Sequence, residues 1–186
     1  QSGNIPYVVI GHMSGEHINA VTFDNEHGAE LAGRYFRATG RKHPAYVSGY
    51  LDMRKKAGFR KGLQHLADEL VVSGSGGSFR HGALAYEQLS KNHPQVDCVL
   101  CANDVLAMGL LRAAIDDGRK IPDDLAVIGF DDIQMASFYN PSISSITLRL
   151  FQIGETSVRL LTRMMNGEEI AHAEQIKCDL ILRESS

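Results

Sequence analysis

The chain has 186 residues, of which 44% are hydrophobic and 22% charged, and its formal net charge is −3. This composition is typical of a soluble globular protein and excludes disordered, fibrous and membrane-spanning chains. The negative balance also excludes an overall basic surface of the kind that neutralises nucleic-acid phosphates. Three cysteines without a framework spacing favour a reducing compartment, so we expect a cytoplasmic protein.

In the first half of the chain, short apolar runs alternate with longer amphipathic segments. The short runs predict strands and the longer segments predict helices. The expected strands are 5–10, 20–23, 45–47 and 70–72, and the expected helices are 26–39, 54–67 and 79–91.

The stretch from Val96 to Asp132 carries the clearest pattern. Two apolar runs, 96–102 and 125–130, enclose a helical segment at 105–115, which together predict a strand–helix–strand unit. Polar residues follow each run, and ligands of open parallel sheets bind beyond the carboxyl ends of the strands. We therefore expect Asn103 and Asp131 to lie side by side, where a small polar molecule would sit.

After Asp132 the alternation changes. Residues 135–141 are predicted to be irregular and 143–148 to form an extended crossover. A helix at 150–166 ends at Gly167, and 175–182 is predicted to be the last strand. The whole pattern predicts an α/β fold with a mostly parallel sheet.

Three local motifs resemble a redox, a nucleotide-binding and a metal site, but each lacks residues or context that such a site requires. Cys98 and Cys101 form a CxxC, but it lies inside a strand pattern and not at a helix start, which favours buried apolar cysteines. The glycine-rich loop 74–78 lacks the residues of a Walker motif and does not complete the dinucleotide fingerprint. His12, Glu16 and His17 have no further ligand at a defined offset, which favours a surface loop over a metal site.

No catalytic nucleophile stands in a suitable context, and no Gly-x-Ser-x-Gly is present. The sequence therefore predicts neither an enzyme nor a bound cofactor or metal.

The polar residues at the strand ends allow two interpretations. Asn or Asp after a strand is a common helix cap, so one residue of each pair is expected to be structural, namely Asp104 and Asp132. The other residue of each pair would face a ligand. An aromatic ring at Phe79 and cations at Arg54 and Lys55 are expected near the same strand ends. Carboxylate, amide, cation and ring together suit a hydroxyl-rich ligand.

At this point the chain resembles a known family, the effector-binding core of LacI/GalR-type transcriptional repressors, which shares its fold with periplasmic sugar-binding proteins. The resemblance rests on an ordered set of motifs. The matching segments are 21–29 (VTFDNEHGA), 40–49 (GRKHPAYVSG), 57–63 (AGFRKGL), 101–109 (CANDVLAMG), 121–132 (IPDDLAVIGFDD) and 141–146 (PSISSI).

The resemblance implies two parallel-sheet, Rossmann-like subdomains of the periplasmic binding protein-like type I fold, which close on an effector. By this mapping, 1–39 with 148–173 form the N-terminal subdomain, and 41–146 with 174–186 form the C-terminal one. By the same mapping, we expect the N-terminal subdomain to be incomplete in this sequence and the helix-turn-helix headpiece that begins such repressors to be absent from it. The family's two-half-site operators further imply a homodimer.

Carried over position by position, Asp131 resembles the family's hydroxyl-binding carboxylate, Asn103 its amide ligand and Phe79 the aromatic that stacks on the effector. Asp24 resembles a family position near the pocket. The chain departs from the family at Lys55, where an arginine is usual. Either Lys55 serves a different ligand or Arg54 has taken the arginine's role.

We therefore expect the effector-sensing domain of a LacI-type repressor, with a carbohydrate-like effector and operator DNA as partners and no membrane contact. The alternative is a periplasmic sugar-binding protein of a transporter. An enzyme on a doubly wound fold is the second alternative, which the mismatched loop 74–78 disfavours.

Overall fold

The computed structural model describes residues 5–11, 19–49, 53–64, 71–73, 76–170 and 172–186. These residues form two compact units. The first unit comprises the described parts of 1–24 and 148–178, and the second those of 25–147 and 179–186.

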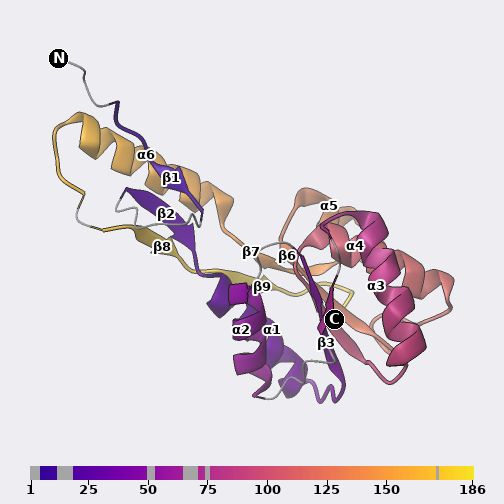
Figure 1. The fold of residues 1–186 in the computed structure, drawn as a ribbon. Coiled ribbons are helices and arrows are strands. Elements are labelled where there is room, and N and C mark those ends of the chain that lie inside the picture. The colour runs from indigo at the N-terminus through magenta and orange to yellow at the C-terminus, as the bar shows by residue number, and fades with distance from the viewer. Residues whose placement is uncertain (1–4, 12–18, 50–52, 65–70, 74–75, 171) are drawn as a thin grey trace. The chain divides into compact units, whose positions relative to one another are not determined.

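The first unit is a three-stranded parallel sheet in the order β1–β2–β8 with one helix, α6, along it (Figure 1). Ile153 and Leu160 of α6 are buried, and so is Val21 of the central strand, which places the small core of this unit between helix and sheet. The elements are β1 (Val9–Ile10), β2 (Ala20–Phe23), α6 (Leu150–Met165) and β8 (Glu174–Ile176).

The second unit is built on a six-stranded sheet in the order β4–β3–β5–β6–β7–β9. All neighbours are parallel except β9, which is antiparallel to β7. The central strands β3, β5 and β6 are almost wholly buried, which explains their continuous apolar runs. The strands are β3 (Pro44–Ser48), β4 (Val71–Ser73), β5 (Cys98–Cys101), β6 (Ala126–Asp131), β7 (Ser144–Thr147) and β9 (Asp179–Ile181).

Two pairs of helices cover this sheet, α1 with α2 and α3 with α4, one pair on each face (Figure 1). The connection from β3 to β4 runs along the sheet in the opposite direction to the connections from β4 to β5 and from β5 to β6. Right-handed crossovers therefore place α2 on one face and both α3 and α4 on the other. The helices are α1 (Asn25–Ala38), α2 (Met53–Leu63), α3 (Phe79–Asn92), α4 (Asp104–Asp116) and the short α5 (Gln134–Phe138).

Glycines allow the two helices of each pair to approach backbone to backbone. A Cβ on Gly58 of α2 would overlap the carbonyl of Glu26 in α1, and a Cβ on Gly109 of α4 would overlap the carbonyl of Phe79 in α3. Side chains larger than hydrogen would therefore force each pair apart.

The structure differs from the predicted elements in four places. The first strand is shorter than 5–10, since only Val9–Ile10 pairs. The predicted crossover at 143–148 is a strand of the sheet, and the predicted irregular segment 135–141 contains α5. The predicted strand 175–182 is two strands in different sheets. The end of the predicted helix 54–67 lies outside the described residues.

The chain also passes between the units at places other than those expected. Helix α1 was expected with the first unit, up to residue 39, but it packs on α2 and on the six-stranded sheet of the second. Strand β8 was expected in the second unit, from residue 174, but it pairs with β2 in the first. The packing of α1 on α2 and the pairing of β8 with β2 thus decide to which unit these two elements belong.

None of the helices in the described ranges has the length and apolarity needed to cross a bilayer.

Candidate functional site

The candidate site lies at one edge of the six-stranded sheet, where β5 and β6 end. These strands are parallel neighbours, with Leu100 paired to Ile128, so their carboxyl ends meet at the same edge. Asn103 follows β5 after one residue, Ala102, and Asp131 is the last residue of β6. The expected juxtaposition of these two strand ends is thus present.

Lys55 of α2 bridges the two strand ends. Its Nζ donates a hydrogen bond of 2.7 Å to the carbonyl of Ala102 and lies 3.6 Å from Oδ1 of Asp131. The ammonium also sits 3.8 Å from the centre of the buried Phe130 ring, a cation–π geometry. The side chain of Lys55 is only 14% exposed, so its ammonium interacts mainly with groups of the protein itself and little with solvent.

Asp131 is presented by a strained backbone. Its φ is 99° and that of Asp132 is 52°, values that residues other than glycine rarely adopt. The side chain of Asp131 is 36% exposed, which leaves carboxylate surface for a ligand. Burial raises the pKa of Asp131, and the nearby Lys55 ammonium opposes that rise.

The two polar atoms of the Asn103 side chain differ in role: the oxygen caps a helix, and the amide nitrogen remains available to a ligand. It is the N-cap of α4, and its side-chain oxygen accepts a hydrogen bond of 2.7 Å from the backbone N–H of Leu106. The amide nitrogen makes no hydrogen bond to any residue that the structure describes, and a Cβ on Gly77 would stand 3.1 Å from it. Asn103 can therefore cap the helix and still offer a donor to a ligand.

Phe79 opens α3 directly after Gly77 and Ser78, so its helix begins beside Asn103. The residue is 53% exposed, so Phe79 is not part of the core. Of the predicted loop 74–78, the first two residues lie outside the described part of the chain.

The remaining two candidates are placed differently. Arg54 is exposed in the first turn of α2, next to Lys55. Asp24 lies at the end of β2, as the last residue of the first unit before the chain enters the second, and its backbone N–H bonds to the carbonyl of Ile176. The structure therefore groups four candidates, Asn103, Asp131, Lys55 and Phe79, around one end of the six-stranded sheet.

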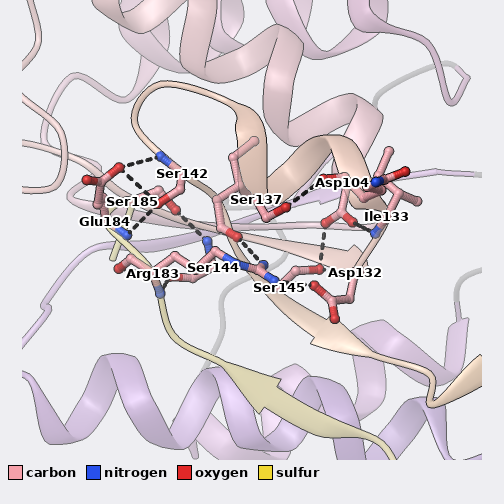
Figure 2. A network of polar contacts seen from close by, with 12 residues as sticks. Asp104, Asp132, Ile133, Ser137, Ser142, Ser144, Ser145, Arg183, Glu184 and Ser185 are labelled. Atoms are coloured by element: carbon pink, nitrogen blue, oxygen red, sulfur yellow. Dashed lines mark hydrogen bonds and ion pairs between the residues drawn. The ribbon is translucent and has the colours of Figure 1, made fainter.

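Asp104 and Asp132 are structural residues, as expected, but not as helix caps, because Asn103 is the N-cap of α4 and Ile133 that of α5 (Figure 2). Asp104 is fully buried and accepts hydrogen bonds from Ser145 Oγ at 2.6 Å and from the Ile133 N–H at 2.8 Å. Asp132 forms an ion pair of 2.7 Å with Arg183. Burial raises the pKa of Asp104 to about 7, despite its two hydrogen bonds, and the charges of Asp131 and Asp132 add to the rise.

Sequence reasoning missed three contributors to this edge: Phe130, Ser145 and Arg183. The ring of Phe130 lies under the Lys55 ammonium, and Ser145 and Arg183 hold the turn after β6. The signal available was a pair of serines, Ser144 and Ser145, in an otherwise apolar strand.

The structure gives no support to a redox role for the CxxC motif or to a metal site among the described residues. Cys98 and Cys101 lie in β5 with fully buried side chains, and burial raises the pKa of both thiols well above the usual range. This is opposite to the low pKa of a redox thiol. The segment with His12, Glu16 and His17 lies outside the described residues, and no cluster of three metal-ligating side chains occurs within them.

A groove of about 550 Å³ lies between the later turns of α3 and α4, away from the strand ends. Its polar groups largely satisfy one another: Tyr86 donates a 2.7 Å hydrogen bond to Asp117, and Arg112 pairs with Asp116 at 2.8 Å. The groove shares no residue with the candidate site.

Two α/β units, with a carboxylate, an amide and a cation at the end of a parallel sheet, define a small-molecule-binding domain. Residues 16–186 match the family described as periplasmic binding protein-like domain, and the chain belongs to that family.

The relatives that it matches are regulators. The chain is 35% identical over 182 residues to catabolite control protein A of Staphylococcus epidermidis, covering 93% of this chain and 54% of that protein. It is 26% identical over 188 residues to the ribose operon repressor of Halalkalibacterium halodurans, covering 98% and 57%. The chain thus spans about half the length of these curated relatives.

Solved structures agree. A complex of the transcriptional regulator CelR with cellobiose has a TM-score of 0.88 at 28% identity, covering 97% of this chain and 59% of that one. A LacI family regulator from Enterococcus faecium with bound ribose has a TM-score of 0.86 at 25% identity, covering 97% and 70%. The resemblance to the effector-binding domain of LacI-type regulators and the predicted fold class are confirmed.

Proposed function

We propose that this chain is the effector-sensing domain of a LacI-type transcriptional repressor and that its effector is a sugar or a sugar derivative. The observation that carries the proposal is the shared edge of β5 and β6, where Lys55 contacts both the partly exposed Asp131 carboxylate and the carbonyl of Ala102, the residue before Asn103. The regulators that the chain resembles, one with cellobiose and one with ribose, support the ligand class.

The chemistry of the edge suits hydroxyl groups. A carboxylate such as Asp131 accepts two hydroxyl hydrogen bonds, and the Asn103 amide nitrogen donates one more. The exposed ring of Phe79 packs on the C–H face of a pyranose or furanose. Lys55 is directed at Asp131 and Ala102, whereas Arg54 is exposed to solvent and could donate to a ligand.

Regulation follows from differential affinity. An effector that binds one arrangement of the domain better than another shifts the population of arrangements, and a linked DNA-binding segment then changes its affinity for the operator. The proposal includes a homodimer, because two operator half-sites require two copies, and a cytoplasmic location, where the operator DNA is found.

We further propose that the intact protein has two subdomains, with α1 in the second and β8 in the first, as the packing of these elements favours, and that it carries a helix-turn-helix headpiece. The sequence of the intact gene tests this directly. A helix-turn-helix segment upstream supports the repressor, whereas a secretory signal peptide in that place would establish the transporter-type binding protein.

The ligand is tested on the intact protein. D-ribose, cellobiose, other neutral sugars, polyols, sugar acids and purines are screened by thermal shift, followed by calorimetry and by operator-binding assays with and without each hit. A sugar that raises the melting temperature and changes operator affinity is expected. Stabilisation by purines or nucleotides alone would contradict the ligand class.

A further inference from the structure

The turn after β6 needs support from outside itself. Asp131 and Asp132 both have left-handed backbone conformations, with φ of 99° and 52°, and neither is glycine. Such conformations persist only where surrounding interactions hold them. The group that holds this turn also decides where the Asp131 carboxylate points.

The carboxylate of Asp104 lies against the turn, between Ile133 and Ser145 (Figure 2). Its Oδ2 accepts the Ile133 N–H at 2.8 Å, and its Oδ1 accepts the hydroxyl of Ser145 at 2.6 Å. The same hydroxyl oxygen accepts the Asp132 N–H at 3.0 Å. Two successive backbone N–H groups of the turn are therefore tied to Asp104, one directly and one through Ser145.

Asp104 is also fixed to the other half of the site. It is the first residue of α4, directly after the N-cap Asn103, whose side-chain oxygen is held by the Leu106 N–H at 2.7 Å. A shift of Asp104 would therefore move the start of α4 and the turn after β6 together.

The buried carboxylate has little room to move. It is fully buried, and a Cβ on Gly129 of β6 would overlap its Oδ1. From the other side, Arg183 of the C-terminal segment pairs with Asp132 at 2.7 Å and donates to the Ile143 carbonyl at 2.7 Å. The turn is thus held between two fixed groups.

We propose that Asp104 is a positioning residue, which sets the placement of Asp131 relative to Asn103 by hydrogen-bonding the turn at Asp132 and Ile133. This inference rests on the proposed function insofar as Asp131 and Asn103 bind the effector. Asp104 itself is covered by the protein and acts through its neighbours.

The test uses three substitutions in the intact protein without ligand. Asp104→Asn keeps an acceptor for the Ile133 N–H, Asp104→Leu keeps the volume without any acceptor, and Ser145→Ala removes only the link to Asp132. The exposed Asp116→Asn, on the same helix, is the matched control. Hydrogen exchange of single amides and the carboxyl carbon shift of Asp131 are measured by NMR.

We expect Asp104→Leu to accelerate exchange of the Ile133 amide by about tenfold or more and to shift the Asp131 carboxyl signal, since an acceptor with charge is lost. Asp104→Asn should leave the Ile133 amide within about threefold of the parent, because its side-chain oxygen rescues that bond. Ser145→Ala should accelerate hydrogen exchange at the Asp132 amide and leave exchange at the Ile133 amide unchanged. The inference would be overturned if the Ile133 amide exchanged equally fast in the parent and in Asp104→Leu. It would also be overturned if Asp104→Asn and Asp104→Leu accelerated that exchange equally. If Asp104→Leu does not fold, the contrast between Asp132 and Ile133 in Ser145→Ala decides.

Calorimetry with D-ribose and cellobiose separates this inference from the proposed function. Where the parent binds one of them, Asp104→Leu should weaken binding by about tenfold or more and Asp104→Asn by less. Unchanged affinity in Asp104→Leu would overturn positioning and leave the ligand class intact. Absence of binding to both sugars in the parent would count against the ligand class, and the amide exchange would still decide positioning.

Discussion

The Nζ of Lys55 lies 3.6 Å from Oδ1 of Asp131 and donates to the carbonyl of Ala102, so one cation joins the ends of β5 and β6. A lysine suits this place because a compact ammonium fits between a carbonyl, a carboxylate and the face of Phe130. The departure from arginine noted in the sequence thus changes what the cation holds: it orients the site's own carboxylate.

Replacing Lys55 should therefore change the pKa of Asp131. Burial raises the pKa of Asp131 and Lys55 counteracts this, so Lys55→Met is expected to raise that pKa further. A carbon-detected NMR titration of the Asp131 carboxyl measures the change, with the exposed Lys91→Met as control. An unmoved titration would show that the 3.6 Å pair does not act on the carboxylate.

Asp131→Ala is expected to abolish effector binding in a protein that stays folded. Hydrogen bonds to a charged group contribute about 1.5–3 kcal/mol each, so the loss of affinity should be about tenfold or more for each bond. Calorimetry on the intact protein checks this, with the exposed Asp123→Ala beside it. Unchanged affinity for a sugar that the parent binds would show that the ligand sits elsewhere.

Asp104 predicts how stability depends on pH. Its pKa is about 7 in the folded protein and 3.8 for an ordinary aspartate, so the folded state binds this proton more tightly than the unfolded state. The stabilisation of the folded state by this bound proton is fully present below about pH 4 and is lost as the pH rises through about 7. Asp104→Asn lacks this dependence.

Urea unfolding at pH 5 and pH 8 tests that expectation. The free energy of unfolding of the parent, taken relative to Asp104→Asn, should be smaller at pH 8 than at pH 5. The opposite order would mean that hydrogen bonds from Ser145 and Ile133 outweigh burial and keep Asp104 ionised.

Two glycine substitutions should have opposite effects. Gly109→Ala inserts a methyl group into the backbone contact between α4 and Phe79 and should destabilise the protein by about 1–3 kcal/mol. Gly154→Ala, at an exposed helical position with open space around it, should stabilise by about 0.5–1 kcal/mol. Chemical denaturation measures both, and a neutral Gly109→Ala would show that the helix pair can separate freely.

The cysteines should be inert in the folded protein. Cys98, Cys101 and Cys178 are all buried, and burial raises the pKa of the first two thiols. A thiol reagent such as DTNB is therefore expected to react only as fast as the protein unfolds, and with all three cysteines in denaturant. Rapid reaction of one thiol under native conditions would revive a redox role for the CxxC.

Local patterns were sufficient for part of this structure. Buried strands have continuous apolar runs, and the polar residues that follow β5 and β6 must meet when those strands are parallel neighbours. That argument correctly brought Asn103 and Asp131 to one edge, but it assigned the cap of α4 to Asp104, whereas the cap is Asn103.

Long-range contacts were beyond the sequence. Arg183 reaches Asp132 across 51 positions, and no local signal predicts that pairing. The split of 174–182 into two strands also depends on which sheet has a free edge, since β8 pairs with β2 and β9 with β7. An alternating apolar pattern is compatible with either sheet and therefore could not locate the passage between units.

The backbone contact between Gly109 and Phe79 has a consequence for how such a sensor can diverge. The main chain of Phe79 is held against α4, while its half-exposed ring contributes little to the core. Exchange of that ring for another side chain would therefore cost little folding free energy and leave the helix in place. Under the proposed function, a lineage of these proteins could change its preferred ligand at position 79 while inheriting the same scaffold.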